Sequence, residues 1–189
     1  MRVIPSVCVG ATLAAAVLSG ACSSTLAPPI PSSVNTIDTV TLYAATGTPV
    51  GTPSAYNIEV DPSVARVRTD TTPIFDFLFD MPGTTPKLYP PGSLPGLARS
   101  AAMQYAGSFA GTTTAPGAGW NDTTALTIDS GSVVLVRGRA VTSCAIGTVF
   151  EYAKLQVLSL DTIARTITFQ ILANANCGYR DLTPGTPKH

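Results

Sequence analysis

Charged side chains and histidine are scarce in this 189-residue sequence. Only 12% of the residues are charged, and the 11 basic and 11 acidic side chains give a formal net charge of zero. Nucleic-acid-binding domains present a basic surface, so we expect no nucleic-acid partner. The single histidine is His189, the last residue. A catalytic triad or Cys–His pair needs a histidine held in a packed site, so we expect neither.

Sequence motifs for catalysis and metal binding are absent as well. The chain has no HExxH zinc motif, no GxSxG nucleophile motif and no glycine-rich phosphate loop. Asp76 and Asp80 share one strand-like segment, but four residues along a strand span about 13 Å. That exceeds the ~5–9.5 Å between the acids of a glycosidase. We therefore predict no enzyme, no catalytic residue and no metal site; a carboxylate-only hydrolase would need acids that the fold brings together.

The one long apolar run lies at the N-terminus. Met1 and Arg2 precede the apolar segment 3–18, and the small residues 19–21 lead to Cys22. A membrane span needs about 20 apolar residues, whereas a shorter run followed by small residues is typical of a secretory signal. The ending Leu-Ser-Gly-Ala-Cys resembles a lipobox, with its leucine one position further from the cysteine than usual.

We therefore predict a lipoprotein signal peptide over 1–21 and acylation of Cys22. Cleavage after Ala21 without lipid, or an uncleaved N-terminal anchor, are the alternatives. The prediction implies an exported protein that is bound to a membrane by its lipid, as an outer-membrane lipoprotein or on the cell surface. Several acyl chains would make that attachment stable, because a single chain binds only marginally.

Two of the four cysteines remain after Cys8 and Cys22 are assigned to the signal and the lipid. In an exported chain, Cys144 and Cys177 most simply form a disulfide. The bridge would close a loop of about 34 residues and stabilise the fold by ~3–4 kcal/mol. The alternative role, as metal ligands, lacks a neighbouring histidine or cysteine.

The mature chain divides into a tether, a domain and a tail. Residues 22–36 are rich in serine and proline, which favours an extended tether. We predict a β-rich domain over 37–182 and a flexible tail over 183–189. Strand-like alternation of apolar and polar residues indicates one compact, all-β antiparallel sandwich or barrel. The expected strands are 38–44, 56–60, 64–69, 74–81, 125–128, 133–137, 148–159 and 166–173.

Three segments carry further expectations. In 74–81, Phe75, Phe77 and Phe79 should share one face as a core stripe. Segment 82–100 contains five prolines and three glycines, which predicts a long loop, held by Leu88, Tyr89, Leu94 and Leu97, that is a candidate ligand or partner contact. Segment 101–109 fits either a short helix or a strand. The last two strands should form a hairpin, whose ends the disulfide would join.

Three segments resemble the HmuY-like haem-binding lipoproteins. Residues 151–159 (EYAKLQVLS), followed by 166–169 (TITF), are similar to the family's closing hairpin. Residues 75–79 (FDFLF) resemble its "WDIAF" strand. Residues 109–120, an aromatic followed by TAPGAGW, resemble its "T-x-AP-x-x-G-aromatic" crossing. The order and rough spacing agree over residues 74–173, about half of the chain.

The resemblance implies an all-β domain on an acylated tether and, in the family, haem bound by histidine or methionine between the matching strands. No histidine lies there, and Met81 and Met103 are the only methionines in that interval. Bis-thioether ligation suits haem iron, whereas packing is the usual role of methionine on a strand. Met81, Met103, Tyr89 and Trp120 are the candidate ligand-binding residues, and haem is the one cofactor considered.

The sequence thus predicts a surface-anchored, non-catalytic binding lipoprotein. Its ligand would be a small hydrophobic molecule, a peptide or another envelope protein. The alternative is a structural or adhesive envelope protein without a small ligand. An apolar cavity beneath segment 82–100 would favour binding, and a solid core there would favour the structural role.

Overall fold

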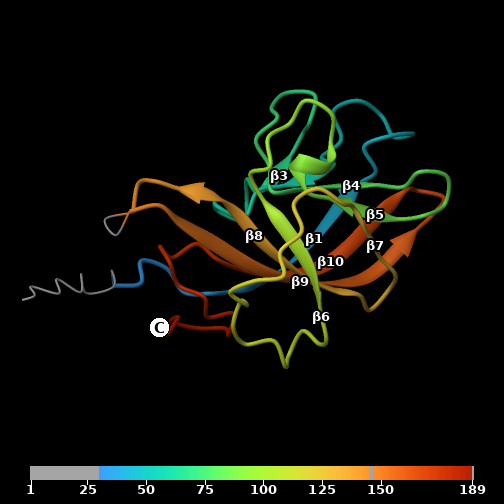
Figure 1. The fold of residues 1–189 in the computed structure, drawn as a ribbon. Helices are drawn as coiled ribbons and strands as arrows, with labels where there is room; N and C mark the ends of the chain where they lie inside the picture. Colours follow the sequence, from blue (N-terminus) through green and yellow to red (C-terminus); the bar gives the residue numbers. More distant parts are fainter. Residues whose placement is uncertain (1–29, 145–146, 189) are drawn as a thin grey trace, which may run out of the picture.

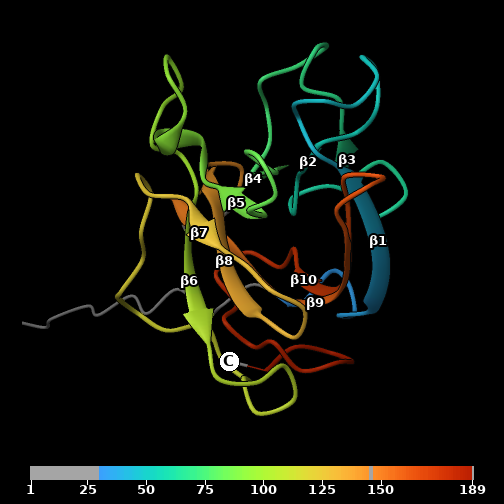
Figure 2. The same cartoon turned by 90° about the vertical axis from the view of Figure 1, so that its right-hand side faces the viewer.

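The fold is a sandwich of two antiparallel five-stranded sheets (Figures 1 and 2). This computed structural model describes residues 30–144 and 147–188, so the predicted signal peptide and Cys22 lie outside the described residues. The prediction of an all-β antiparallel domain is confirmed, and the sandwich replaces the barrel alternative. Within the described ranges, no helix has the length and apolar character needed to cross a membrane.

One sheet is built from long strands in the order β1-β10-β9-β8-β6. Its members are β1 (Ile37–Tyr43), β6 (Ala102–Ala106), β8 (Val133–Val141), β9 (Val149–Asp161) and β10 (Thr166–Asn174). Strands β9 and β10 form the predicted hairpin, and a register shift occurs between Thr168 and Phe169. Strand β6 resolves the ambiguity of segment 101–109 in favour of a strand, because all five of its residues pair with β8.

The other sheet is built from short strands in the order β3-β2-β4-β5-β7. Its members are β2 (Ala55–Tyr56), β3 (Arg66–Val67), β4 (Phe77–Asp80), β5 (Lys87–Tyr89) and β7 (Leu126–Thr127). The strands expected over 56–60 and 64–69 are therefore two residues long. Segment 82–100 is only partly a loop, because it contains β5 and the 3-10 turn η1 (Pro91–Ser93). Pro86 and Pro90 flank β5 directly and limit its length, since proline cannot donate to a ladder.

The main core lies between the sheets and centres on three aromatic rings. Tyr56 stacks on Phe77 with ring centroids 5.6 Å apart, and Phe169 meets both edge-on at 6.0 and 5.8 Å. Rings from both sheets therefore interlock across the interface, an arrangement that adds stability beyond buried area alone. Met81 and Met103 are both fully buried in this same core.

The expected stripe of three phenylalanines is wrong at one position. Phe77 and Phe79 lie in the main core, but Phe75 packs with Leu78 on the outer face of the short-strand sheet. The alternation breaks because β4 begins only at Phe77. Before that point the chain turns the Asp76 side chain between the sheets, where it binds Arg139.

Segment 82–100 covers the outer face of the short-strand sheet. Tyr89, Leu94 and Leu97 pack against a buried cluster of Ala55, Val67, Phe75 and Leu78, while Leu88 reaches the main core. These are the residues predicted to hold the segment down. The segment therefore covers this face of the sheet with packed side chains.

The outer face of the long-strand sheet is covered by a crossing connection and the C-terminal segment. Phe109, Leu135 and Leu182 belong to the cluster beneath them. Lys154 is buried there and its Nζ donates to the carbonyls of Phe109 and Thr112, at 2.7 and 2.9 Å. Burial lowers the pKa of Lys154. This lysine fastens the crossing to the sheet.

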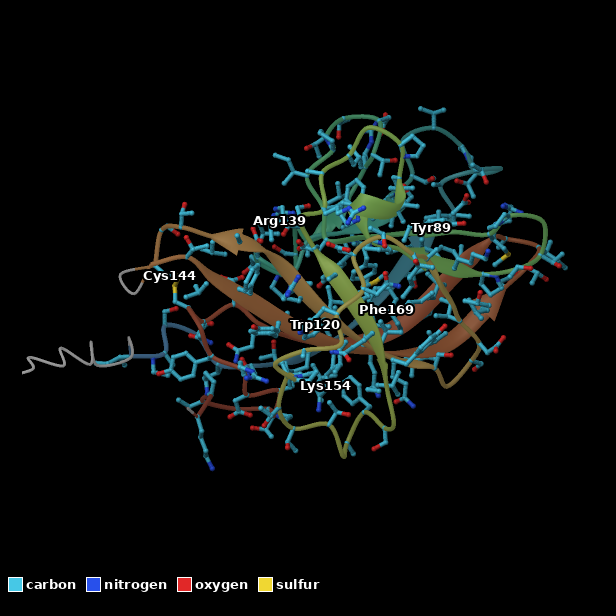
Figure 3. All side chains as sticks on the ribbon, in the orientation of Figure 1. Tyr89, Trp120, Arg139, Cys144, Lys154 and Phe169 are labelled. Atoms are coloured by element: carbon cyan, nitrogen blue, oxygen red, sulfur yellow. A yellow bond between two sulfur atoms is a disulfide. The ribbon has the colours of Figure 1, made fainter. Side chains whose placement is uncertain are left out.

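Cys144 and Cys177 form the predicted disulfide, with a Cα–Cα distance of 5.8 Å. Cys144 precedes β9 and Cys177 follows β10, so the bridge joins the open ends of that hairpin (Figure 3).

The ends of the described chain lie against the domain. Asn35 and Gly185 exchange two backbone hydrogen bonds of 2.8 and 2.9 Å. The Asn176 side chain accepts from the backbone N–H groups of Ser32 and Ser33, at 2.8 and 3.1 Å. In the expected tether (22–36), residues 32–35 are hydrogen-bonded to the domain, and in the expected tail (183–189), Lys188 donates its backbone N–H to Asp181 at 2.7 Å.

Candidate functional site

A groove of about 390 Å³ opens at the end of the sandwich where β10 stops. Its walls come from three separate parts of the chain: the segment before β1, the loop after β2, and the residues at the end of β10. The lining consists of Ser33, Val34, Thr36, Tyr56, Ile58, Glu59, Val60, Asp61, Pro62, Ala173 and Ala175. Its volume is within the ~300–1,000 Å³ range of small-ligand sites.

The lining is mostly apolar, with two carboxylates among the apolar side chains. Val34 and Val60 remain 59% and 38% exposed, so the groove presents unfilled apolar surface to solvent. Glu59 and Asp61 are its two acidic residues. Tyr56 also lines it, and burial and the charge of Asp38 raise the pKa of its phenol to about 12, against the opposing effect of Arg66.

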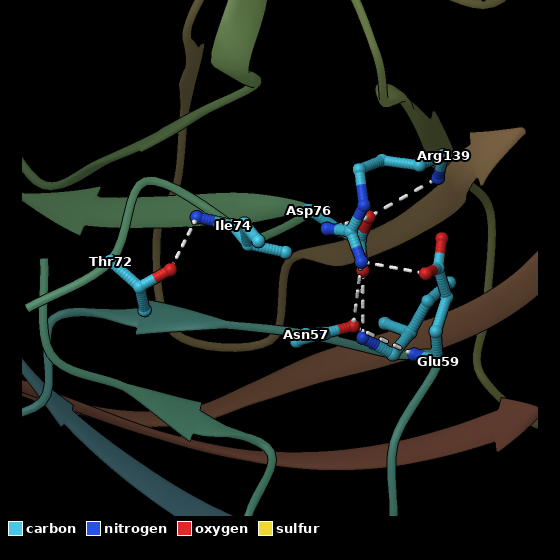
Figure 4. Close-up of polar contacts among 7 residues, drawn as sticks. Asn57, Glu59, Thr72, Ile74, Asp76 and Arg139 are labelled. Atoms are coloured by element: carbon cyan, nitrogen blue, oxygen red, sulfur yellow. Dashed lines mark hydrogen bonds and ion pairs between the residues drawn. The ribbon is translucent and has the colours of Figure 1, made fainter.

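A buried group of acids lies next to the groove, around Arg139 (Figure 4). Arg139 donates from Nη2 to Glu59 at 2.6 Å and from Nη1 to Asp76 at 3.2 Å. Asp76 is fully buried and also accepts from the backbone N–H groups of Ile58 and Arg139, at 2.8 and 3.2 Å. Asn57 accepts from the same guanidinium at 3.3 Å. The cluster therefore ties the two sheets together.

A β-bulge in β8 creates this arrangement. The pairing of β8 with β9 shifts between Arg137 and Ala140, and a bulge re-aims a side chain. A Cβ at Gly138 would lie 3.1 Å from Ile58 and 3.5 Å from the Glu59 carboxylate. The missing side chain at Gly138 thus lets the loop after β2 approach β8, and Arg139 reaches the opposite sheet.

Glu151 on β9 completes the cluster and leaves it short of positive charge. Glu151 is only 6% exposed. Its pKa is raised to about 7 by burial first, and then by the charges of Glu59 and Asp76. Burial also raises the pKa of Asp76 to about 6, against the opposing charge of Arg139. Two carboxylates bind one guanidinium and a third lies nearby, and burial favours the protonated form of Glu151.

Two carboxylate oxygens of this cluster have no hydrogen-bond partner within the described part of the chain. They are Oε1 of Glu59 and Oε2 of Glu151, and both atoms are buried. Glu151 lies two residues before Ala153, which pairs with the groove residue Ala173. The unsatisfied oxygens are therefore at the groove end of the sandwich. Buried polar atoms without partners are rare and point to function or to a missing group.

The four predicted ligand-binding residues do not come together. Met81 and Met103 are in the main core, Tyr89 lies on the outer face of the short-strand sheet, and Trp120 lies on the outer face of the long-strand sheet (Figure 3). Trp120 packs on Tyr152 at 5.8 Å, and its indole N–H donates to the Pro116 carbonyl at 3.1 Å. None of the four lines the groove.

Met81 and Met103 do not fit the haem that the family resemblance implies. Both side chains have 0% exposure and pack among core residues from both sheets. Ligation of an iron at either sulfur would require the core to open. Within residues 30–144 and 147–188, no group of three His, Cys, Asp or Glu side chains is placed to hold a metal ion.

Sequence reasoning missed Glu59, Arg139, Glu151 and the groove. One local signal was present: Glu151 occupies an inward position of β9, in phase with Ala153, Leu155 and Val157. A charged residue at a strand position that faces the core predicts a buried charge, and a buried charge needs a compensating group.

No family model, curated protein or solved structure matches this chain.

Proposed function

We propose that the chain is an exported, lipid-anchored, non-catalytic binding protein of the bacterial envelope, and that it holds its ligand in the groove. The observation that carries this proposal is the mostly apolar groove of about 390 Å³ between the segment 33–36, the loop 56–62 and the end of β10. Small-ligand sites combine apolar walls with a few placed polar groups, and this groove has both.

The disulfide supports the export part of the proposal. Disulfides persist in oxidising compartments and are rare in the cytosol. The Cys144–Cys177 bridge joins the hairpin whose end lines the groove. The expected acylation of Cys22 would attach this domain to the membrane surface.

The arrangement of the acids favours binding over catalysis. The fold does bring Glu59, Asp76 and Glu151 together, as a carboxylate hydrolase would need. However, a general acid or base must come within hydrogen-bond reach of its substrate. Asp76 is fully buried and already bound by three donors, and Glu151 is nearly as buried. We also propose that the anchored β-domain is related to the HmuY-like lipoproteins and that its ligand binds in the groove.

A titration with 1-hexanol tests the binding function. We expect its ¹H–¹⁵N shift changes to cluster at residues 33–36, 56–62 and 173–175 and to saturate. Ala175→Phe, which fills an exposed wall, should weaken binding at least fivefold; Ala98→Phe, an equally exposed site outside the groove, should not. Shifts that are scattered, or absent with both hexanol and its amine analogue, would favour the structural or adhesive alternative.

Metabolic labelling with a radiolabelled fatty acid tests the anchor. We expect label on the wild-type chain and none on Cys22→Ser. An unlabelled mature wild-type chain would instead indicate a secreted protein that is cleaved after Ala21 and carries no lipid.

A further inference from the structure

We infer that the groove selects an organic cation, an ammonium head on an apolar stem. The inference rests on the proposed binding function and names its ligand class. The stem would contact the apolar walls around Val34, Val60 and Ala175, and the head would approach the Glu59 carboxylate at the inner end.

The charge around the groove favours a cation. Glu59 and Asp61 line it, and Asp76 and Glu151 lie behind Glu59 in the buried cluster. The cations close to these groups are Arg139, which is bound to Glu59 and Asp76, and Arg66, which lies with Asp38 in the neighbouring hollow along β1. Acidic groups therefore outnumber basic ones at the inner end of the groove.

The hydrogen bonds within the acid cluster also favour a cation as the ligand. Arg139 directs its donors to Asp76, Asn57 and Glu59, yet Oε1 of Glu59 and Oε2 of Glu151 remain unpaired in the described structure. When Glu59 and Glu151 are both ionised, the cluster therefore has acceptors left over and lacks donors. An ammonium brings three donors and no acceptor, so it supplies what is missing, whereas an anion or a carbonyl ligand would add acceptors.

Proton linkage follows from this geometry. A positive charge beside Glu59 stabilises the ionised form of nearby Glu151, because an opposite charge favours ionisation. Binding of the amine should therefore displace the proton that the cluster retains, and the ligand cation and that proton compete for the same excess of negative charge.

Hexylamine and 1-hexanol form a matched pair of probes, equal in stem and different in head. On the full mature chain at pH 7, calorimetry should show hexylammonium binding at least tenfold more tightly than hexanol, with release of part of a proton detected from buffers of different ionisation enthalpy. Glu59→Gln should reduce the ratio to about one. Asp129→Asn, which removes an exposed acid at the other end of β8, should leave it unchanged.

Equal affinity for the two probes in the wild-type chain would overturn the cation inference while leaving the binding function intact; binding of neither would remove both. Asp61→Asn, at the exposed rim, keeps the test decisive if Glu59→Gln does not fold, because the ratio of the two affinities should then fall partway.

A blocked tripeptide with a central lysine and the same tripeptide with that lysine acetylated form a second pair of probes. A tenfold preference for the unmodified lysine assigns the head to a peptide side chain, and a preference shown only by hexylamine assigns it to a free amine.

Discussion

The two sheets of the sandwich are made in different ways. Four of the five strands in one sheet are seven to thirteen residues long, and each pair of neighbouring strands is joined by at least five residue pairs. No strand in the other sheet exceeds four residues. The long strands hold each other by backbone pairing, whereas the short ones depend on packing against the core and on the loops between them. The groove lies where a loop of the short-strand sheet faces the end of β10. The long strands therefore supply the scaffold, and β2 with the loop after it supplies six of the eleven residues that line the groove.

The largest effect should come from the core that the two sheets share. Phe169→Ala removes a fully buried ring that contacts Tyr56 and Phe77, and such deletions cost about 3–5 kcal/mol. Urea unfolding should show this loss of unfolding free energy. Phe150→Ala, a half-buried ring near the start of β9, should cost less than half as much. Equal losses would mean that the long-strand sheet does not depend on the interface.

The disulfide should rank next. Replacing both Cys144 and Cys177 with serine removes a bridge across 33 positions, and the chain-entropy model gives a loss of about 3–4 kcal/mol. Thermal unfolding of the double variant should match that of the reduced wild-type protein. A variant as stable as the oxidised protein would show that the long ladders alone hold the hairpin ends.

The acid cluster should make stability depend on pH. The raised pKa of Glu151, about 7, means that the folded state holds its proton more tightly than the unfolded state. This contribution is fully present below about pH 4.5 and is lost as the pH rises through about 7. Glu151→Gln should therefore be more stable than wild type at pH 8, by about 1–2 kcal/mol, and no more stable at pH 4.5. Asp129→Asn serves as the exposed control, and the prediction fails if both variants follow the wild-type pH profile.

The smallest effect should come from the outer face of the short-strand sheet. Leu97→Ala trims a half-buried side chain of segment 82–100, so we expect a loss of about 1 kcal/mol, below the range for fully buried leucines. Denaturant midpoints would measure it. A loss as large as that for Phe169→Ala would show that this outer packing, rather than the shared core, holds the short strands.

The same contrast explains what the sequence could predict. Alternation over 148–159 and 166–173 is long enough to define β9 and β10, and the cysteine positions then implied the bridge. The short strands are harder to predict, since two residues are too few to show an alternation of apolar and polar side chains. Phe75 was misassigned because β4 begins later than the alternation does. The acid cluster depends on a bulge at Gly138 and on contacts between residues 59, 76, 139 and 151, which are distant in sequence, so alternation within one strand could not reveal it.

The most direct test uses the fact that Glu59 and Glu151 are the only glutamates in the sequence. Their side-chain carboxyl ¹³C signals can be titrated without ambiguity, with and without saturating hexylamine. We expect Glu151 to titrate near pH 7 in the free protein and at a lower pH when the amine is bound. A Glu151 signal that titrates near pH 4.5 and does not respond to the amine would contradict it.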